Sequence, residues 1–132
     1  MKFGKGYSCY KVLNRGEILT ILREQDLVKF PEVVLHHVTW EFGVMEGYPI
    51  EPTSARVIGV KSNDKIQALV VEIHGTGEEP TKRPDGKTLH ITLSLDKAAG
   101  AKPVHSNDLL TNMDGVMALN IPLDLEPAFI PF

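Results

Sequence analysis

Two short segments of the chain share the pattern His-apolar-Thr, His37-Val38-Thr39 and His90-Ile91-Thr92. Histidine is the side chain that exchanges a proton near neutral pH, and a threonine hydroxyl donates a hydrogen bond to an anionic oxygen. Two imidazoles and two hydroxyls in one site suffice for acid-base chemistry on a phosphate without a metal. The pattern therefore indicates His37, His90, Thr39 and Thr92 as catalytic residues.

Both segments show the alternation that is typical of a β-strand. Because successive strand side chains point to opposite faces, His37, Thr39 and Glu41 are expected on one face, and Val38, Trp40 and Phe42 on the apolar face. His90 and Thr92 are separated from Ile91 and Leu93 in the same way. The alternation directs His36 away from His37, so packing or an interface is its favoured role.

In His37-Val38-Thr39-Trp40 and His90-Ile91-Thr92-Leu93 the chain resembles the 2H phosphoesterase superfamily. Residues 83–92 and 102–110 also resemble the RNA-repair branch of 2′,3′-cyclic phosphodiesterases. The resemblance covers roughly residues 7–110 and implies a pseudo-symmetric fold with the two motifs on central strands around a cleft. It implies a 2H-type cyclic phosphodiesterase (a hydrolase of EC class 3.1.4) with no cofactor. The chain is shorter than many members and has no clear helix signal between the motifs.

The 132 residues predict one domain that spans 1–132, with 42% apolar and 23% charged residues. Turn signals and periodicity predict an α+β fold with mostly antiparallel strands and one or two helices. The expected strands are 7–13, 33–44, 55–60, 66–73, 90–95 and 116–121. A helix is expected after Asn14, with Glu17 completing a capping box, and a short one at 105–110. Residues 122–132 are expected to form an extended arm.

Further residues are candidates for substrate binding. Residues 75–87 form a long polar loop in which Lys82, Arg83 and Lys87 can face an anion, or can be ordinary solvated charges. Ser106 and Asn107 either cap a helix or bind a ligand. Among the aromatic residues, Tyr7 and Tyr10 are candidates for stacking on a nucleobase, whereas Trp40 is expected in the core. Of the remaining histidines, His74 is favoured as structural, and the sequence leaves the role of His105 open.

Charge and cysteine content limit the partners and the compartment. The net charge of −3 argues against a surface for duplex DNA, so a small nucleotide or an RNA end is the expected substrate. The single cysteine excludes an internal disulfide and favours a reducing compartment. Neither a signal peptide nor a membrane span is indicated. We therefore expect a cytoplasmic protein, with a monomer as the default.

Three classes of function remain open from the sequence. The first is a metal-independent phosphodiesterase acting on an RNA 2′,3′-cyclic phosphate end, on a small cyclic phosphate of a mononucleotide or of ADP-ribose, or on a signalling cyclic oligonucleotide, as a phage enzyme would. The second is a non-catalytic nucleotide-binding module. The third, a metallohydrolase, is disfavoured because adjacent His36 and His37 cannot easily ligate one metal from a regular strand, and no acidic cluster accompanies them.

Overall fold

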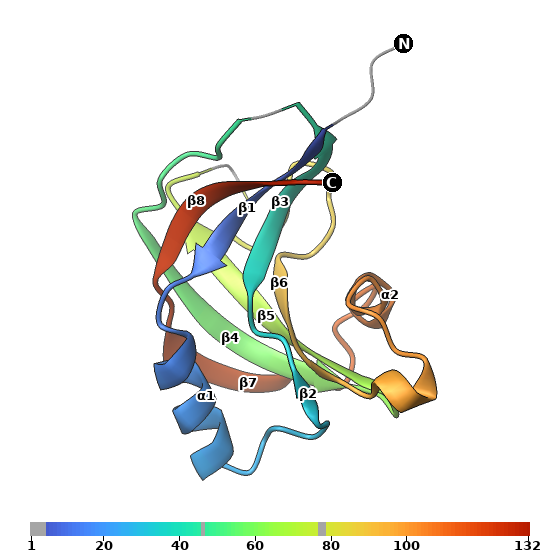
Figure 1. Ribbon diagram of the computed structural model, residues 1–132. Coiled ribbons are helices and arrows are strands. Elements are labelled where there is room, and N and C mark those ends of the chain that lie inside the picture. The colour runs from blue at the N-terminus through green and yellow to red at the C-terminus, as the bar shows by residue number, and fades with distance from the viewer. Residues whose placement is uncertain (1–4, 46, 77–78) are drawn as a thin grey trace.

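The computed structural model describes residues 5–45, 47–76 and 79–132. The described residues form two antiparallel sheets, two α-helices and one 3-10 turn (Figure 1). This architecture confirms the predicted α+β class. In chain order, the elements are β1 (Gly6–Val12), α1 (Arg15–Glu24), β2 (Glu32–Val33), β3 (His37–Val44), β4 (Ser54–Ser62), β5 (Ile66–His74), β6 (His90–Leu95), η1 (Lys97–Ala99), α2 (His105–Leu109), β7 (Met117–Pro122) and β8 (Leu125–Pro131).

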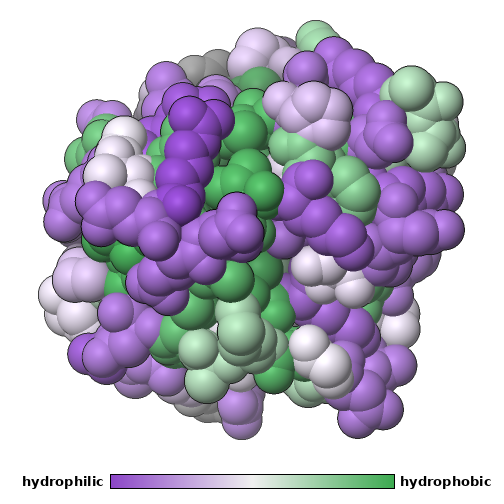
Figure 2. All heavy atoms as spheres, turned by 90° about the horizontal axis from the view of Figure 1, so that it is seen from below, coloured by the Kyte–Doolittle hydropathy of each residue, from purple (hydrophilic) through white to green (hydrophobic). Residues whose placement is uncertain are grey.

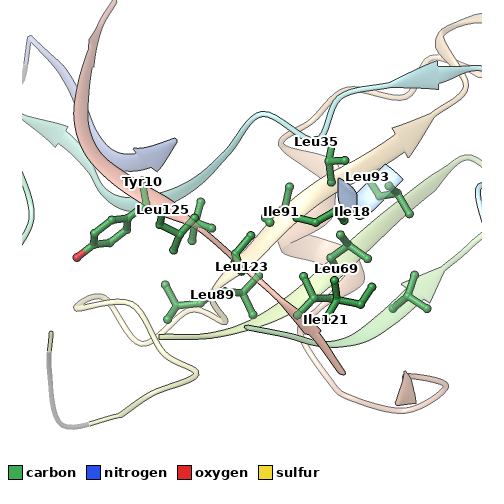
Figure 3. Packing of buried hydrophobic residues seen from close by; sticks show 14 of the residues in the cluster. Tyr10, Ile18, Leu35, Leu69, Leu89, Ile91, Leu93, Ile121, Leu123 and Leu125 are labelled. Atoms are coloured by element: carbon green, nitrogen blue, oxygen red, sulfur yellow. The ribbon is translucent and has the colours of Figure 1, made fainter. Parts of the chain in front are cut away.

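The larger sheet has the order β2-β6-β5-β4-β7, and its centre is the hairpin of β4 and β5. Nearly every residue of β5 is buried, because both faces of this strand are covered. One face packs Leu69 and Val71 into the main core together with Ile18 of α1, and Figure 3 shows this packing around Leu69. On the opposite face Val70 packs near Leu110, beside α2. The predicted hairpin is confirmed.

The smaller sheet has the order β3-β1-β8, with β1 in the middle. The expectation that residues 122–132 form an irregular arm is wrong, because β8 pairs with β1 along its whole length from Leu125 to Pro131. Proline has no backbone N–H to donate in a β-ladder, so the prolines of this segment favoured an irregular structure. An edge strand tolerates proline, and Pro127 lies opposite Tyr10 in such a strand.

The predicted strand 33–44 is divided between the two sheets. Up to Leu35 the chain bonds to β6, since the Leu35 amide donates to the Thr92 carbonyl at 2.9 Å. Leu35 then adopts a left-handed conformation, with φ of 47°, and from His36 onward the chain bonds to β1. This switch brings β3 beside β6 where the two sheets meet (Figure 1).

A second irregularity lies inside β3. Thr39 pairs with Cys9, but the adjacent Ser8 pairs with Glu41, so Trp40 is an extra residue in the ladder. Such a bulge reverses the facing of the side chains that follow it. The prediction that Phe42 lies on the apolar face opposite His37 is therefore wrong for the part of the strand after the bulge. Trp40 itself packs against the main core, as expected.

The helix ends also differ from the expectation. The Asn14 side chain makes no cap bond to α1. Instead its Nδ2 donates to the Pro122 carbonyl at 2.9 Å and its Oδ1 accepts from the Asp124 amide at 2.9 Å. The predicted capping box does not form: Asn14 Nδ2 lies 3.4 Å from Glu17 Oε2, but the shorter bonds of the Asn14 side chain are to residues distant in the sequence. Val104 precedes α2, so Ser106 and Asn107 lie inside that helix rather than at its cap.

Figure 2 shows the face of the molecule seen from below in Figure 1. This face is mostly hydrophilic, with a band of hydrophobic side chains between hydrophilic ones. Within residues 5–45, 47–76 and 79–132, no helix has the length and apolar character needed to cross a membrane. The described part of the chain also has no helix between β3 and β6, in agreement with the sequence.

Candidate functional site

Both His-apolar-Thr motifs open into one pocket of about 640 Å³ between β3 and β6. The volume is in the range of small-molecule sites. The motif residues come from two different sheets, so the sheet switch at Leu35 is what brings them together. The pocket is lined by Tyr7, Val34, His36, His37, Thr39, Phe42, Arg83, Asp85, Lys87, His90, Thr92, Pro103, Val104 and Asn107.

His90 begins β6 and is held by the backbone that precedes it. Its Nδ1 lies 2.8 Å from the Thr88 carbonyl oxygen, and because a carbonyl only accepts, Nδ1 carries a proton. Nε2 is then the nitrogen left for a ligand. Burial lowers the pKa of His90, the bond to the Thr88 carbonyl opposes this, and the nearby charges of Arg83 and Lys87 lower it further. A neutral His90 with an unprotonated Nε2 is a base.

His37 begins β3 and has a side chain as its partner. Its Nδ1 lies 2.8 Å from Nδ1 of His36, and the two rings are perpendicular. Burial lowers the pKa of His37 to about 4, with smaller contributions from the neighbouring His36 and from His90. Both motif histidines line the same pocket, close enough for a positive charge on His90 to lower the pKa of His37.

The two motif threonines have different surroundings. Thr92 is buried, and its Oγ1 lies 2.8 Å from the Ser106 hydroxyl and 3.3 Å from the Pro103 carbonyl. Ser106 is fully buried in α2 and orients the Thr92 hydroxyl. Thr39 makes no side-chain hydrogen bond within the described residues. Both hydroxyls can donate to a phosphate oxygen, since a hydroxyl rotates to suit its partner.

An aromatic wall, made of Tyr7, Phe42 and Phe132, stands beside His37. Tyr7 and Phe42 are stacked with centroids 5.7 Å apart, and Phe132 lies 5.2 Å from Phe42. The Tyr7 ring is 5.3 Å from the His37 ring. Phe42 is 65% exposed although it is a large apolar side chain. An exposed aromatic face at a pocket offers a stacking surface for a planar ligand.

Cationic side chains from the loop before β6 also line the pocket. Arg83 is only 7% exposed, and its Nη2 bonds Asp85 Oδ2 at 2.7 Å, while its Nε has no partner among the described residues. Lys87 is exposed and also lines the pocket. Lys82 lies instead in an adjoining cavity of about 290 Å³, which shares His90, Lys87 and Asn107 with the main pocket.

The predicted binding residues thus fall into three groups. Arg83 and Asn107 line the main pocket, and Lys82 lines the adjoining one. Ser106 lines neither cavity and contacts Thr92. The prediction that Tyr10 binds substrate is wrong, because this side chain is fully buried in the core beside Trp40, and its hydroxyl donates to the Ile50 carbonyl at 2.7 Å.

His36 is the main residue whose place the sequence did not predict. Alternation sends it away from His37, but β3 begins only at His37 and Leu35 has positive φ, so alternation does not apply to His36. The ring is exposed and lines the pocket. The signal in the sequence that could have placed His36 at the site is that it directly precedes His37. Phe42 was placed wrongly because the bulge at Trp40 has no signature in the sequence.

The other two histidines lie outside both cavities. His74 is paired with Glu72 at 2.7 Å, and His105 Nδ1 accepts from the Lys102 amide at 3.1 Å. Both have local structural roles. Within the described residues no group of three His, Cys, Asp or Glu side chains has the arrangement of a metal site.

Comparisons of this chain with protein-family models, with curated proteins and with solved structures found no match.

Proposed function

We propose that the protein is a 2H-type phosphodiesterase that hydrolyses the cyclic phosphate of a nucleotide or of an RNA end by metal-independent two-histidine acid-base catalysis. One observation carries this proposal: His37, Thr39, His90 and Thr92, from two motifs of the same pattern, line one pocket. The resemblance of these motifs to the 2H phosphoesterases supports the same reaction.

The residues of the pocket match the needs of the reaction. Opening a cyclic phosphate requires a base that takes a proton from water and an acid that protonates the leaving ribose oxygen. The two imidazoles supply these roles. Negative charge grows on the non-bridging oxygens, where the hydroxyls of Thr39 and Thr92 donate hydrogen bonds, and a donor of this kind lowers the barrier by about 3 kcal/mol. Lys87 and Arg83, the latter paired with Asp85, line the same pocket and add positive charge to it.

A nucleotide fits the pocket better than a phosphate alone. The aromatic wall provides a surface for a nucleobase next to His37, and stacking on an aromatic side chain contributes about 1–3 kcal/mol per base. The partner we propose is therefore a small nucleotide or an RNA end, with no part for duplex DNA or a membrane. A cytoplasmic monomer agrees with such a substrate and with a single, buried cysteine, Cys9.

A cyclic oligonucleotide is a second candidate substrate. The adjoining cavity of about 290 Å³ shares His90 with the main pocket and adds Lys82, so it offers room and positive charge for a neighbouring phosphate. Asp108 also lines this cavity and reduces its net charge. The reaction would be the same, with a linkage between two nucleotides in place of a terminal cyclic phosphate.

The proposed function is tested by a panel of substrates in the presence of a chelator. The panel contains 2′,3′-cyclic mononucleotides, ADP-ribose cyclic phosphate, a short RNA with a 2′,3′-cyclic end and cyclic dinucleotides, with products identified by mass spectrometry. We expect turnover of at least one substrate, and no turnover by the His37→Ala, His90→Ala double variant. His105→Ala, outside both cavities, is the matched control and keeps full activity.

Two outcomes contradict the proposed function. Tight binding of a panel member with no product after hours indicates a non-catalytic binding module instead. Turnover that disappears with the chelator and returns with added metal indicates a metallohydrolase.

A further inference from the structure

We propose that His36 and His37 form a two-imidazole acid, in which the exposed His36 stores the proton that His37 delivers to the leaving group, while His90 is the base. This inference rests on the proposed function and assigns the two catalytic roles, which the motifs leave open because they are alike. It also gives a function to His36, which is not part of either His-apolar-Thr motif.

The geometry places one proton between the two rings. Nδ1 of His36 and Nδ1 of His37 are 2.8 Å apart, a hydrogen-bond distance at which one nitrogen carries the proton and the other accepts. His37 then has Nε2 as its remaining nitrogen, in a side chain that lines the pocket beside Thr39. Any proton that His37 gives up from Nε2 can be replaced at Nδ1 from His36.

The Nδ1 partner of His90 is a backbone carbonyl instead of an imidazole. The Nδ1 proton is bound to the Thr88 carbonyl, which cannot supply another proton. Neutral His90 therefore presents an unprotonated Nε2 and accepts a proton from water. Two histidines with the same motif thus differ in their second hydrogen-bond partner, and this difference assigns the base to His90 and the acid to His37.

Burial explains why His37 needs a helper. Its pKa of about 4 leaves His37 alone uncharged near neutral pH, so it is a poor proton reservoir. His36 is exposed at the pocket and exchanges protons with water directly, whereas His37 is partly buried. A protonated His36 donates Nδ1–H to His37, which keeps its own proton on Nε2 and remains neutral.

The proton transfers balance in one turnover. The oxygen of water forms a bond to phosphorus and its proton passes to Nε2 of His90. The bond from phosphorus to the leaving ribose oxygen breaks, and this oxygen takes the proton from Nε2 of His37. The Nδ1 proton of His36 moves to Nδ1 of His37, so His36 ends neutral and His90 ends protonated. Exchange with solvent returns both to their starting states.

The charges around the pair come from every element that packs against it. Among the groups around His37 in the described residues, His36 is the histidine that both contacts His37 and is exposed to water. The charged and titratable groups on these elements are Tyr7 and Lys11 on β1, His90 on β6, and Arg83, Asp85 and Lys87 in the loop before β6. Arg15 on α1 donates from Nε to the carbonyl of Val34, two residues before His36.

The pH dependence of kcat in His36→Asn tests the inference, with His105→Asn as the matched control. Asparagine keeps a hydrogen-bonding group near His37 but does not titrate. We expect the high-pH limb of the profile to move to lower pH by more than one unit, because His37 must then hold the proton itself. At pH 7.5 kcat should fall about 10-fold or more, with KM changed less than threefold. His36→Phe, which keeps a ring, should behave alike.

Three results overturn the inference. If His36 is only a nearby charge, its removal raises the pKa of His37 and moves the same limb to higher pH. If its role is structural, kcat falls by the same factor at every pH. If it has no role, the profile of His36→Asn coincides with that of the wild type.

A measurement without substrate separates this inference from the proposed function. ¹⁵N NMR of the histidine side chains reports which ring nitrogen carries the proton. In the wild type near neutral pH, we expect His37 protonated at Nε2 and His90 at Nδ1, and His37 should change to the Nδ1 form as the pH rises. Identical tautomers for His37 and His90 at all pH values overturn the pair. Turnover of no substrate by the wild type, with opposite tautomers present, would overturn the proposed function alone.

Discussion

The two copies of the His-apolar-Thr motif lie in contrasting surroundings. The copy on β6 is next to the fully covered strand β5, with Thr92 buried against Ser106 and His90 bound to a backbone carbonyl. The copy on β3 is on an edge strand with a bulge after Thr39, and His37 is bound to an exposed imidazole. One motif is on an interior strand of the larger sheet, and the other is on an edge strand that pairs with β1 only.

The difference shows that a motif does not fix the chemistry of its residues. The tripeptides are alike, but the two histidines have different partners at Nδ1. The partner is the Thr88 carbonyl for His90 and the His36 imidazole for His37. A backbone carbonyl can only hold a proton in place, whereas a second histidine can exchange one. Equal sequences can therefore take the base and the acid role of one reaction.

The largest expected effect is the loss of either motif histidine. His90→Ala and His37→Ala should each lower kcat by about 10²–10⁴-fold, the usual contribution of an acid or base. An added primary amine or imidazole should restore more activity to His37→Ala than to His90→Ala, because the space at His37 opens toward the exposed His36. Single-turnover assays measure both. Wild-type turnover by either variant would remove that residue from the mechanism.

The threonines should differ less in kcat than in stability. Thr39→Val and Thr92→Val each remove a donor to the phosphate and should lower kcat by about 10²–10³-fold. Only Thr92→Val leaves a buried partner, the Ser106 hydroxyl, without its bond, which should cost about 1–3 kcal/mol of unfolding free energy. Urea titration measures the stability. Equal stabilities of the two variants would contradict the contrast between the surroundings.

The pKa of His37 predicts a loss of stability in acid. The folded value is about 4 and the ordinary value about 6.5, so between these values the unfolded chain binds more protons. The contribution of neutral His37 is complete above pH 6.5, and about 3 kcal/mol of it is lost as the pH falls to 4. His37→Gln should therefore unfold with a weaker dependence on pH in this window. The same dependence in variant and wild type would show that His37 is not desolvated.

The smallest expected effect concerns the aromatic wall, which stands beside His37 only. Phe42→Ala should raise KM for a nucleotide substrate about 5–100-fold, from the loss of one stacking contact, and change kcat little. Phe42→Tyr, which keeps the ring, is the matched control and should retain the wild-type KM. An unchanged KM in Phe42→Ala would place the nucleobase elsewhere, such as the cavity next to Lys82.

Local patterns predicted part of this site well. The regular strand around His90 follows the alternation rule, and Ile91 and Leu93 lie in the main core as expected. The pairing of both motifs in one pocket was anticipated as well. The hairpin of β4 and β5 follows from its β-branched runs and the turn at Asn63.

The failures come from features that no local pattern encodes. The bulge at Trp40 depends on how β3 pairs with β1, and the position of His36 depends on the backbone turn at Leu35. Asn14 finds partners more than 100 residues away. The prolines of β8 argue against a strand when the sequence is considered alone. An edge strand permits proline, but whether a strand lies at an edge depends on the whole sheet. Tyr10 was misplaced because an aromatic side chain reads equally well as core or as binding surface.

Leu35 is subject to two demands that few residues satisfy together. Its positive φ favours glycine or asparagine, and its fully buried side chain requires a bulky hydrophobic group. Glycine would ease the backbone and leave a hole, while isoleucine or valine would fill the hole and strain the backbone. Few substitutions are thus tolerated at Leu35, which does not line either cavity. The residue after this turn, His36, is the third imidazole of the pocket, beside His37 and His90.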